Sequence, residues 1–315
     1  MELIELKEVV KEFNKVKVLS NVNIHIEEGD LFGIIGQSGS GKTTLLNILA
    51  GFIEPTSGTV SYVSKIDHQP KNLHENFHRI KRHLGFNPQH PSFYPKLTVK
   101  ENLLHFGQLY GLKHETLINN AKNLLQFTQL YGHRDKLAEQ LSGGMQKRLD
   151  ISCSLIHKPK ILFLDEPTSD LDPVMQKEII QLIQEVNKQD VTIVIASHHL
   201  ESIEKICNKL AIIHHGQVHS FGEFEEIRKP FLKNNININI KIGQDKERII
   251  QLVKKLPVNK IVDKEDYLVL YPLDTEKTLN MLNKLIKEEN LYLHDIDLRK
   301  PSLAEIFAKI TAEKD

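Results

Sequence analysis

The feature that most constrains this chain is a glycine-rich segment, Gly36-Gln37-Ser38-Gly39-Ser40-Gly41-Lys42-Thr43-Thr44. The apolar run 31–35 before it predicts a buried strand, and residues 45–50 after it have the apolar spacing of a helix. A strand, a glycine-rich loop and a helix in this order are the context of a phosphate-binding loop. Glycines allow successive backbone N–H groups to face one anion, and the N-terminal end of the helix adds a partial positive charge. The alternative is a glycine-rich turn that merely caps a helix, and the two correct flanks argue against it.

Two pairs of side chains predict ATP and Mg²⁺ as ligands. Lys42 can bring a mobile positive charge to the β- and γ-phosphates, and the hydroxyl of Thr43 can coordinate Mg²⁺. The acidic pair Asp165-Glu166 follows the continuously apolar run 161–164, which is typical of a central parallel strand. Because α/β sheets bind ligands at the carboxyl ends of strands, we expect Asp165 to hold Mg²⁺ through its water shell. Glu166 is expected to polarise the attacking water as a general base, with a solvated acidic strand end as the alternative.

Composition narrows the class of protein. A chain of 315 residues suits one large domain and a smaller one, and 40% hydrophobic residues suffice for packed cores. Lysine plus arginine equals aspartate plus glutamate at 41 each, so the net charge gives no reason to expect a nucleic-acid partner. The two cysteines, Cys153 and Cys207, lie in helix-like stretches without a metal-ligand pattern. They predict reduced core thiols of a cytosolic protein.

Neither the N-terminus nor the apolar runs of the chain predict insertion into a membrane. The N-terminus is acidic where a secretory signal is basic, and no apolar run approaches the roughly 20 residues that span a bilayer. We therefore expect a soluble chain that acts at a membrane only through partners. The histidines between residues 68 and 90 are irregularly spaced, which favours a solvated polar segment over a transition-metal site.

Hydrophobic periodicity predicts an α/β fold with a mainly parallel sheet that is covered on both faces. Alternating patterns at 4–13 and 18–26 predict half-buried antiparallel strands. Helical spacing within residues 98–157, between two strands of the sheet, predicts an inserted helical subdomain. The other expected elements are strands at 59–63, 84–86, 161–164, 191–196 and on both sides of Gly216, and helices at 142–156, 173–187 and 200–208.

Residues 229–315 predict a second, smaller domain, because the composition changes after Lys229-Pro230. The strictly alternating run 235–242 predicts a strand with one buried face. The patterns that follow it predict a helix at 245–256, strands at 259–262 and 267–271, a helix at 275–288 and a strand at 291–298. This order of strands and helices fits a ferredoxin-like α+β module, and a short amphipathic helix at 302–310 closes the chain.

The order of motifs in residues 1–228 resembles that of the ATP-binding subunits of ABC transporters. Gly36 to Thr43 match the Walker A loop, and residues 161–166 match the Walker B strand with its catalytic glutamate. The other matches are Gln89 for the Q-loop, residues 169–172 for the D-loop, His198 for the switch histidine, and Leu141-Ser142-Gly143-Gly144-Met145 for the signature. Methionine stands where glutamine is more common in the signature, a departure frequent in the exporter type. The resemblance implies a P-loop NTPase with a RecA-like core, an antiparallel β subdomain and the inserted helical subdomain.

The resemblance also implies a pocket shared between two subunits. Ser142, Gly143 and Gly144 open a helix and form an anion site, although a plain helix N-cap is the alternative from the residues alone. In the family this loop contacts the γ-phosphate that the opposite subunit holds, so two ATP molecules lie between subunits arranged head to tail. ATP then favours the closed dimer, and its hydrolysis removes that preference.

Four further residues take their expected roles from the same resemblance. His198 is expected to hydrogen-bond the γ-phosphate, although a lone histidine after a buried strand is more often structural. Gln89 is expected to act in catalysis and to join the Mg²⁺ ligands named above, and Asp172 of the D-loop to contribute to nucleotide binding. Phe13 matches the aromatic residue that stacks on adenine, with a core phenylalanine as the alternative.

The function implied is that of a cytoplasmic ATPase, peripheral on the cytoplasmic face of the cell membrane. It would dimerise with a second copy or a homologous ATPase subunit and drive a separate integral membrane permease. Residues 91–95 are expected to line the groove for a helix of that permease, with a packed loop as the alternative. Residues 229–315 resemble, more loosely, the appendage on ATPase subunits of ABC-2-type exporters. A soluble ABC-type ATPase and a ligand-sensing regulator not coupled to transport stay open as other functions.

Overall fold

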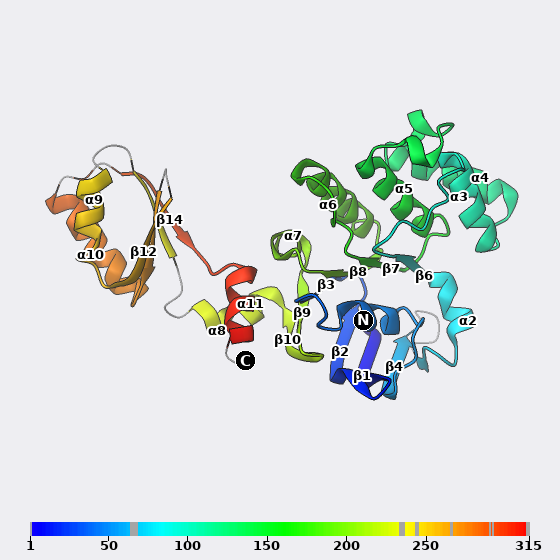
Figure 1. Cartoon of the computed structure of the whole chain (residues 1–315), viewed down its shortest axis with the longest axis horizontal. Helices are drawn as coiled ribbons and strands as arrows, with labels where there is room; N and C mark the ends of the chain where they lie inside the picture. Colours follow the sequence, from blue (N-terminus) through cyan, green and yellow to red (C-terminus); the bar gives the residue numbers. More distant parts are fainter. Residues whose placement is uncertain are drawn as a thin grey trace. The chain divides into compact units, whose positions relative to one another are not determined.

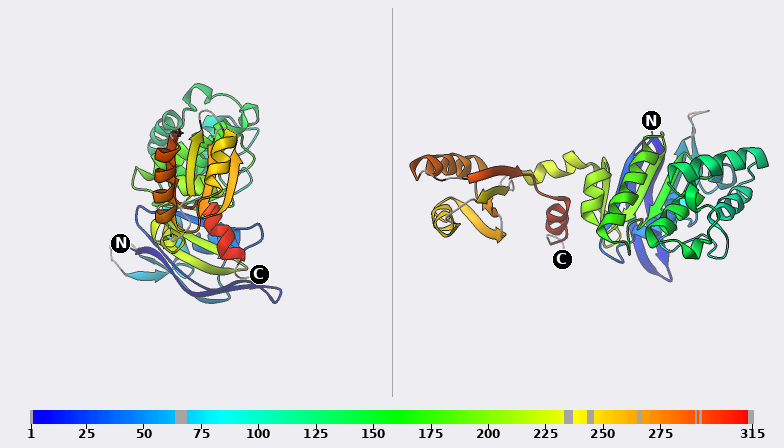
Figure 2. Two further views of the ribbon diagram at one scale, coloured as in Figure 1. Left: turned by 90° about the vertical axis from the view of Figure 1, so that its left-hand side faces the viewer. Right: turned by 90° about the horizontal axis from the view of Figure 1, so that it is seen from above.

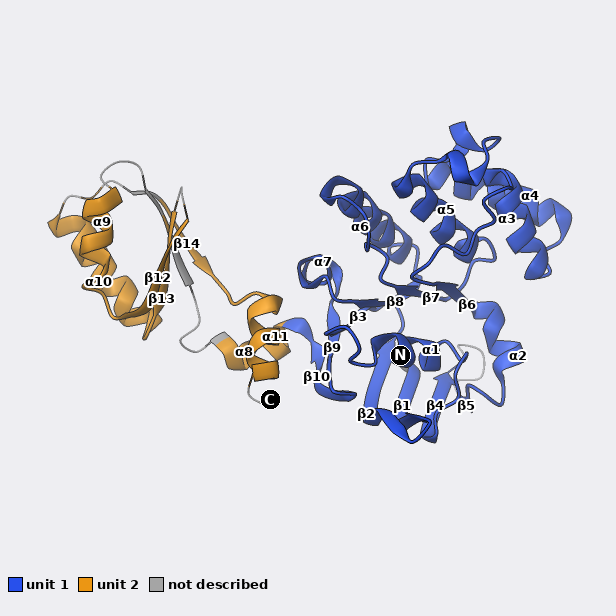
Figure 3. Ribbon diagram, viewed as in Figure 1, with its two compact units in different colours: residues 1–224 blue, residues 225–315 orange. Residues whose placement is uncertain are grey.

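The computed structural model describes residues 2–63, 69–232, 237–242, 246–264, 267–289, 291 and 293–312. The chain divides into two compact units, Met1–Phe224 and Glu225–Asp315 (Figure 3). The division falls at the start of helix α8 (Phe224–Leu232), four residues before the boundary after residue 228 that composition predicts. Some residues of the expected elements, namely 235, 236, 245 and 292, lie outside the described ranges, as does His68, the first of the histidines considered above.

Unit 1 contains one antiparallel and one mainly parallel sheet (Figure 1). The antiparallel sheet has the order β2-β1-β4-β5 and consists of β1 (Glu2–Phe13), β2 (Val16–Glu27), β4 (Ser57–Val63) and β5 (Pro70–Asn72). The other sheet has the order β10-β9-β3-β8-β7-β6 and consists of β3 (Leu31–Gly36), β6 (Leu84–Asn87), β7 (Ile161–Asp165), β8 (Thr192–Ser197), β9 (Lys209–His214) and β10 (Gln217–Glu223). Its neighbouring strands are parallel except for the pair β9 and β10, so the predicted mainly parallel sheet is confirmed.

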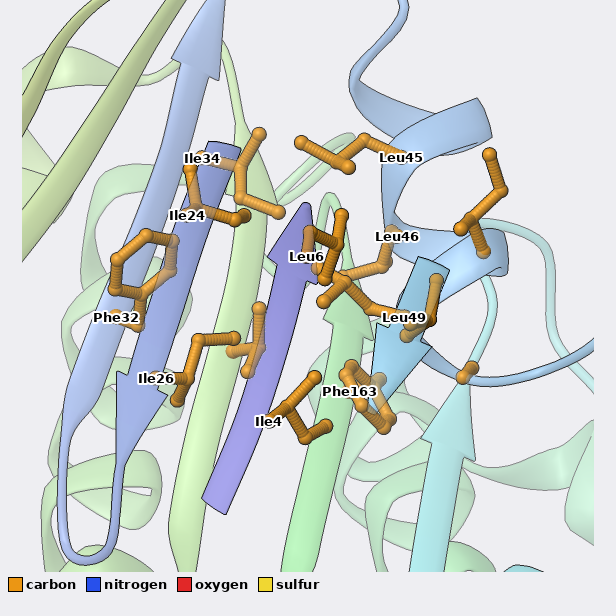
Figure 4. Close-up of a cluster of buried hydrophobic side chains, with 14 of the residues drawn as sticks. Ile4, Leu6, Ile24, Ile26, Phe32, Ile34, Leu45, Leu46, Leu49 and Phe163 are labelled. Atoms are coloured by element: carbon orange, nitrogen blue, oxygen red, sulfur yellow. The ribbon is translucent and has the colours of Figure 1, made fainter. Parts of the chain in front are cut away.

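Helix α1 (Lys42–Leu49) packs between the two sheets, against β2 on one side and β3, β7 and β8 on the other. Figure 4 shows the core at this place, where Ile4 and Leu6 of β1 gather with Leu45 and Leu46 of α1. Every residue of β3 is buried because both faces of this strand are covered. The phosphate loop between β3 and α1 is therefore anchored at both ends in the main core.

Helices cover the opposite face of the parallel sheet and lie above it in Figure 1; Figure 2 shows unit 1 from two further sides. Helix α5 (Gly143–Leu155) packs on β6, α6 (Pro173–Asn187) on β8, and α7 (Leu200–Ile206) on β3. Proline stands at the first position of α6, where its missing N–H costs no helical hydrogen bond. Coverage of the sheet on both faces is thus confirmed.

The inserted helical subdomain consists of α3 (Val99–Leu109), α4 (His114–Phe127) and α5. It has its own core, which includes Leu103, Leu117, Leu125 and Leu149. Helix α3 begins with a capping box between Thr98 and Glu101. The short elements of unit 1 are α2 (Phe77–Ile80) and 3₁₀ turns at Lys81–His83, Tyr131–His133 and Ala138–Gln140.

Unit 2 is an α+β unit in which helix α8, which the sequence patterns did not predict, is followed by elements in the expected order. The elements of the unit are α8, β11 (Asn237–Ile242), α9 (Lys246–Val253), β12 (Val258–Lys264), β13 (Tyr267–Pro272), α10 (Thr275–Glu288), β14 (Leu293–Arg299) and α11 (Leu303–Ala312). The four strands form a sheet of order β12-β13-β11-β14, in which every neighbouring pair is antiparallel. Its core joins residues of β11, α9, β13 and α10, namely Ile240, Ile249, Val253, Leu268, Leu270 and Leu282.

Two expectations from composition can be compared with the structure. Cys153 and Cys207 are both buried and free, as expected of core thiols, and burial raises the pKa of each. Across the residues that the structure describes, we find no helix with the length and apolar character to cross a bilayer.

Candidate functional site

The strand order brings three distant segments to one edge of the parallel sheet. Strand β8 lies between β3 and β7, and the parallel register pairs Ile35 with Ser197 and Asp165 with Ala196. The carboxyl ends of β3, β7 and β8 therefore lie side by side. The phosphate loop follows β3, the acidic pair ends β7, and His198 follows β8. This is the edge at which open α/β sheets bind their ligands.

Two glycines give the phosphate loop its shape. Gly41 has a φ of +102°, in the left-handed region that favours glycine, and a Cβ there would lie 2.9 Å from Leu19. A Cβ on Gly36 would lie 2.4 Å from the carbonyl oxygen of Ile213, which is closer than any side chain tolerates. The backbone of the loop thus depends on glycine at both ends. Ser40 between them is buried, and its hydroxyl has no hydrogen-bond partner among the described residues.

Lys42 lies at the start of α1, directly after this loop. Its Nζ donates to the carbonyl oxygens of Gly36 at 3.0 Å and Gln37 at 2.9 Å. The side chain is buried, and burial lowers the pKa of Lys42, while the Glu166 and Asp165 carboxylates oppose that shift. The ammonium group is thus held in the loop by neutral acceptors, a position from which it can bind the phosphates of a nucleotide.

Thr43 and Asp165 offer oxygen ligands that fit Mg²⁺. The Thr43 hydroxyl donates to Oδ1 of Asp165 at 3.3 Å, which joins α1 to the end of β7. Burial raises the pKa of Asp165, the Thr43 hydrogen bond and nearby lysines lower it, and Glu166 raises it further. Hydroxyl and carboxylate oxygens are the hard ligands that Mg²⁺ prefers. These two residues therefore fit the ion that the sequence predicts.

Four hydrogen bonds hold the Glu166 carboxylate in place, and their donors belong to Ser197 at the end of β8 and to His198 after it. Ser197 Oγ donates to Oε2 at 3.1 Å, and the backbone N–H of His198 donates to Oε1 at 3.1 Å and to Oε2 at 3.3 Å. Nδ1 of His198 lies 2.7 Å from Oε1 and donates there in the tautomer that carries its proton on Nδ1. Glu166 is buried and has a φ of +46°, a strained conformation of the kind that gathers at functional sites. The carboxylate is thus preorganised at the edge of the sheet.

The structure does not bring every expected site residue to this edge. Ser142 is exposed at the start of α5, where its hydroxyl accepts from the N–H of Met145 at 3.4 Å. Asp172 is exposed at the start of α6, where it accepts from the N–H groups of Val174 and Met175. Both act as helix N-caps here, and no hydrogen bond within the described residues joins either to the phosphate loop.

Phe13 and Gln89 lie at the surface. Phe13 is 42% exposed, and the Lys11 ammonium lies over its ring, 4.8 Å from the ring centroid. The alternative of a core phenylalanine is therefore wrong. Gln89 is exposed in the loop after β6. An exposed aromatic face and an exposed amide can still meet a ligand or a second chain, which is the position that the expected roles require.

Sequence reasoning missed three residues near the site. Ser197 holds Glu166, and its only sequence signal is a hydroxyl at the end of a buried apolar strand. Asp150 and Lys147 of α5 contact the segment around Gln89. In the sequence they are two opposite charges in a helical stretch that also contains apolar residues. They were missed because such charges are more often solvated than buried.

Comparison with known proteins agrees with this geometry. The fold and the site define a P-loop nucleotide-binding protein. Residues 19–169 match the family "ABC transporter", and residues 222–311 match "ATP-binding protein DrrA1-3-like, C-terminal domain". An uncharacterized ABC transporter ATP-binding protein of Alkalihalophilus pseudofirmus is 31% identical over 276 residues, which are 87% of this chain and 97% of that protein. The chain therefore belongs to the family of ABC transporter ATP-binding subunits.

Two further similar proteins extend the comparison. The bacitracin transport ATP-binding protein BcrA of Bacillus licheniformis is 29% identical over 309 residues, covering 98% of this chain and 97% of BcrA. A dimeric ATP-binding cassette solved in a post-hydrolysis state with ADP and Pi is 30% identical, with a TM-score of 0.60. That match covers 70% of this chain and 98% of the solved one.

Proposed function

We propose that this chain is the ATP-hydrolysing subunit of an ABC-type membrane exporter. The observation that carries the proposal is the fixed carboxylate of Glu166, held by Ser197 and His198 beside the Thr43–Asp165 pair. A base, a metal-binding pair and a phosphate loop at one strand edge are the parts that ATP hydrolysis by water needs.

The residues divide the work as follows. Gly36 to Thr44 bind the phosphates through backbone N–H groups and the Lys42 ammonium, and Phe13 stacks on adenine. Thr43, Asp165 and Gln89 would hold Mg²⁺, which would supply positive charge that offsets the charge of the phosphates. Glu166 accepts a proton from the attacking water, so that ATP and water yield ADP and phosphate.

His198 has two tasks in this proposal. Its backbone N–H and the Nδ1–H of its ring hold Glu166, and Nε2 of the same ring donates to the γ-phosphate when the imidazole carries both protons. The side chain is 52% exposed, which supports access to a ligand at the edge of the sheet. A single residue thereby links the position of the base to the presence of the phosphate.

We propose further that two copies, or this chain and a homologous ATPase subunit, close head to tail on two ATP molecules. Ser142, Gly143 and Gly144 then complete the pocket of the partner, and Asp172 of the D-loop lies nearby. In support, a Cβ on Gly143 would meet no atom within 4 Å, so the start of α5 is open to a second chain. The dimeric cassette with ADP and Pi has the same fold as unit 1.

The exporter assignment rests on relatives and on unit 2. BcrA is named for bacitracin transport, and the match to the C-terminal domain of DrrA1-3-like proteins spans unit 2. We propose that unit 2 is a ferredoxin-like module, because its strand order β12-β13-β11-β14 with antiparallel neighbours is that of a split βαβ sheet. The chain would lie on the cytoplasmic face of the membrane and drive a separate permease.

The test of hydrolysis is the variant Glu166→Gln, compared with Glu185→Gln on the exposed face of α6. The amide at position 166 keeps the shape but cannot accept the proton, so turnover should fall at least about 100-fold. Binding of MgATP should persist, and the protein should dimerise with ATP in sedimentation experiments. Glu185→Gln should behave as the unchanged protein. Turnover of Glu166→Gln near that of the unchanged protein would exclude Glu166 as the base.

The test of coupling is purification from membranes. A stable partner with several membrane-spanning helices, and stimulation of ATP hydrolysis when the two are reconstituted in vesicles, supports the motor function. A purely soluble partner, with no effect of any membrane protein on turnover, would point to the soluble ATPase or the ligand-sensing regulator instead.

A further inference from the structure

A buried carboxylate on helix α5 makes three short contacts outside its own helix. Asp150 is 1% exposed, and its Oδ2 accepts from Nδ2 of Asn87 at 2.6 Å. Its Oδ1 accepts from the backbone N–H of Ser92 at 2.9 Å and from the Ser92 hydroxyl at 2.6 Å. Three donors satisfy the charge, as burial of a carboxylate requires. Asn87 is itself fully buried at the end of β6.

These hydrogen bonds enclose the loop that carries Gln89. Asn87 lies before Gln89 and Ser92 after it, so both ends of the loop are bonded to the same carboxylate. Gln89 itself is exposed between them. The loop is thus hydrogen-bonded to α5 at both ends, and we find no hydrogen bond of the Gln89 side chain within the described residues.

A second residue of α5 supports the same connection. Lys147, one turn before Asp150, donates to the carbonyl oxygen of Pro88 at 3.5 Å. Burial lowers the pKa of Lys147, and Asp150, Asp165 and Asp170 oppose that shift. The lysine is therefore a half-buried cation among carboxylates of α5, β7 and the D-loop. It adds a contact at Pro88, directly before Gln89, to the two at the ends of the loop.

We propose that Asp150 is a positioning residue that fastens the Gln89 loop to α5, so that Gln89 and Ser142 move as one body. The inference rests on the proposed function, in which Gln89 serves the ATP of its own copy and Ser142 that of the partner. Helix α5 is continuous from Gly143 to Leu155, so a displacement at Asp150 is carried about two turns to Ser142. Loss of the hydrogen bonds of Asp150 then weakens the closed dimer but leaves the binding of ATP to a single copy intact.

A merely structural role of Asp150 predicts a different pattern. Removal of a buried hydrogen-bonded carboxylate would lower the melting temperature and the folded fraction. Among the molecules that stay folded, it would change neither the ATP affinity of a single copy nor the dissociation constant of the ATP-bound dimer. The two readouts together therefore separate positioning from stability.

The experiment uses the full chain with Glu166→Gln as the parent, because this variant keeps ATP bound. Asp150→Asn, Asn87→Asp and the double variant are added to it. Asp150→Asn turns an amide donor toward the Asn87 amide and removes the charge of the pair. Asn87→Asp places two carboxylates next to each other. The double variant exchanges the amide and the carboxylate between the two positions and keeps the net charge. Dimerisation with MgATP is measured by sedimentation, ATP affinity with a fluorescent nucleotide on the dilute chain, and folding by circular dichroism.

The expected result is a dimer dissociation constant raised at least about tenfold in both single variants, the size expected when a buried charge-assisted pair is broken. ATP affinity of the single copy should change less than about twofold, because the phosphate loop is untouched. The double variant should return the dissociation constant to within about threefold of the parent, because the Asn–Asp bond is restored.

Two results would overturn the inference. The first is that the folded single variants dimerise with the same dissociation constant as the parent. The second is that the double variant folds and binds ATP but has a dissociation constant as high as those of the single variants. If Asp150→Asn does not fold, Ser92→Ala decides, because it removes one of the three contacts at an exposed residue. An unchanged dissociation constant in Ser92→Ala then overturns the proposal. If the Glu166→Gln parent itself does not dimerise with MgATP, that result refutes the proposed pocket shared between two copies rather than the role of Asp150.

Discussion

Replacement of His157 by glutamine is expected to make the protein less sensitive to acid. Nε2 of His157 donates to the carbonyl oxygen of Leu84 at 3.0 Å, in the tautomer that leaves Nδ1 unprotonated. Nδ1 is buried and has no partner among the described residues, and the ring stacks on Tyr110 with centroids 3.6 Å apart. Burial lowers the pKa of His157 from 6.5 to about 4, although the Leu84 hydrogen bond raises it.

The sign and the size of the effect follow from linkage. A histidine whose pKa is lower in the folded state than in the unfolded chain stabilises the fold above the unfolded pKa. That stability is lost as the pH falls from 6.5 through the folded value of about 4, because the unfolded chain binds the proton first. The two pKa values give a loss of about 1.3 kcal/mol between about pH 7.5 and about pH 5.5. The full shift corresponds to about 3.4 kcal/mol below pH 4.

The assay is urea unfolding followed by circular dichroism at both pH values. Glutamine can donate to the Leu84 carbonyl but does not titrate, so the unchanged protein should lose about 1.3 kcal/mol more than His157→Gln on acidification. Other titrating groups are common to both and cancel in the difference. His114→Gln, at an exposed residue of α4, serves as the control and should follow the unchanged protein. Equal acid sensitivity of His157→Gln and the unchanged protein would refute the argument.

Two more substitutions test the nucleotide site. Gly36→Ala places a Cβ 2.4 Å from the Ile213 carbonyl, so the loop must shift, and ATP affinity by calorimetry should fall at least about tenfold. An affinity unchanged by this methyl group would contradict the loop geometry. Phe13→Ala should weaken ATP binding roughly 2- to 12-fold, whereas Phe13→Tyr should keep it, since a ring contact contributes about 0.5–1.5 kcal/mol. Equal affinity of these two variants would remove Phe13 from the adenine contact.

Local patterns were enough to predict the elements that form the site. The phosphate loop and the acidic pair each follow an uninterrupted apolar strand, and the residues of β3 and β7 are indeed buried throughout. Such runs are buried because both faces of a central parallel strand are covered. The meeting of Thr43 with Asp165 depends on β8, which is inserted between β3 and β7 although it follows both in the chain. Periodicity alone did not predict that pairing; it was predicted from the hydroxyl and carboxylate oxygens that Mg²⁺ prefers and from the position of Asp165 at the carboxyl end of a strand.

The contacts of Asp150 and Ser197 lie beyond what local pattern predicts. Asp150 stands between Leu149 and Ile151 in a helix with apolar residues on several sides, and its partners are 58 and 63 positions away. No periodicity tells whether such a carboxylate faces solvent or a buried amide. The aromatic Phe13 illustrates the converse, because alternation along β1 left its burial open and the structure exposes it. Tertiary partners decide both cases.

The exposed start of helix α5 has a genetic consequence. If two copies close head to tail, as proposed above, Ser142 serves the pocket of the partner rather than its own phosphate loop, so a damaged copy would disable a pocket in a healthy one. In a cell that makes equal amounts of intact and Ser142-altered chains, random pairing leaves only about a quarter of the pairs with both pockets whole. Alterations at this helix should therefore be dominant, whereas those that prevent folding should be recessive.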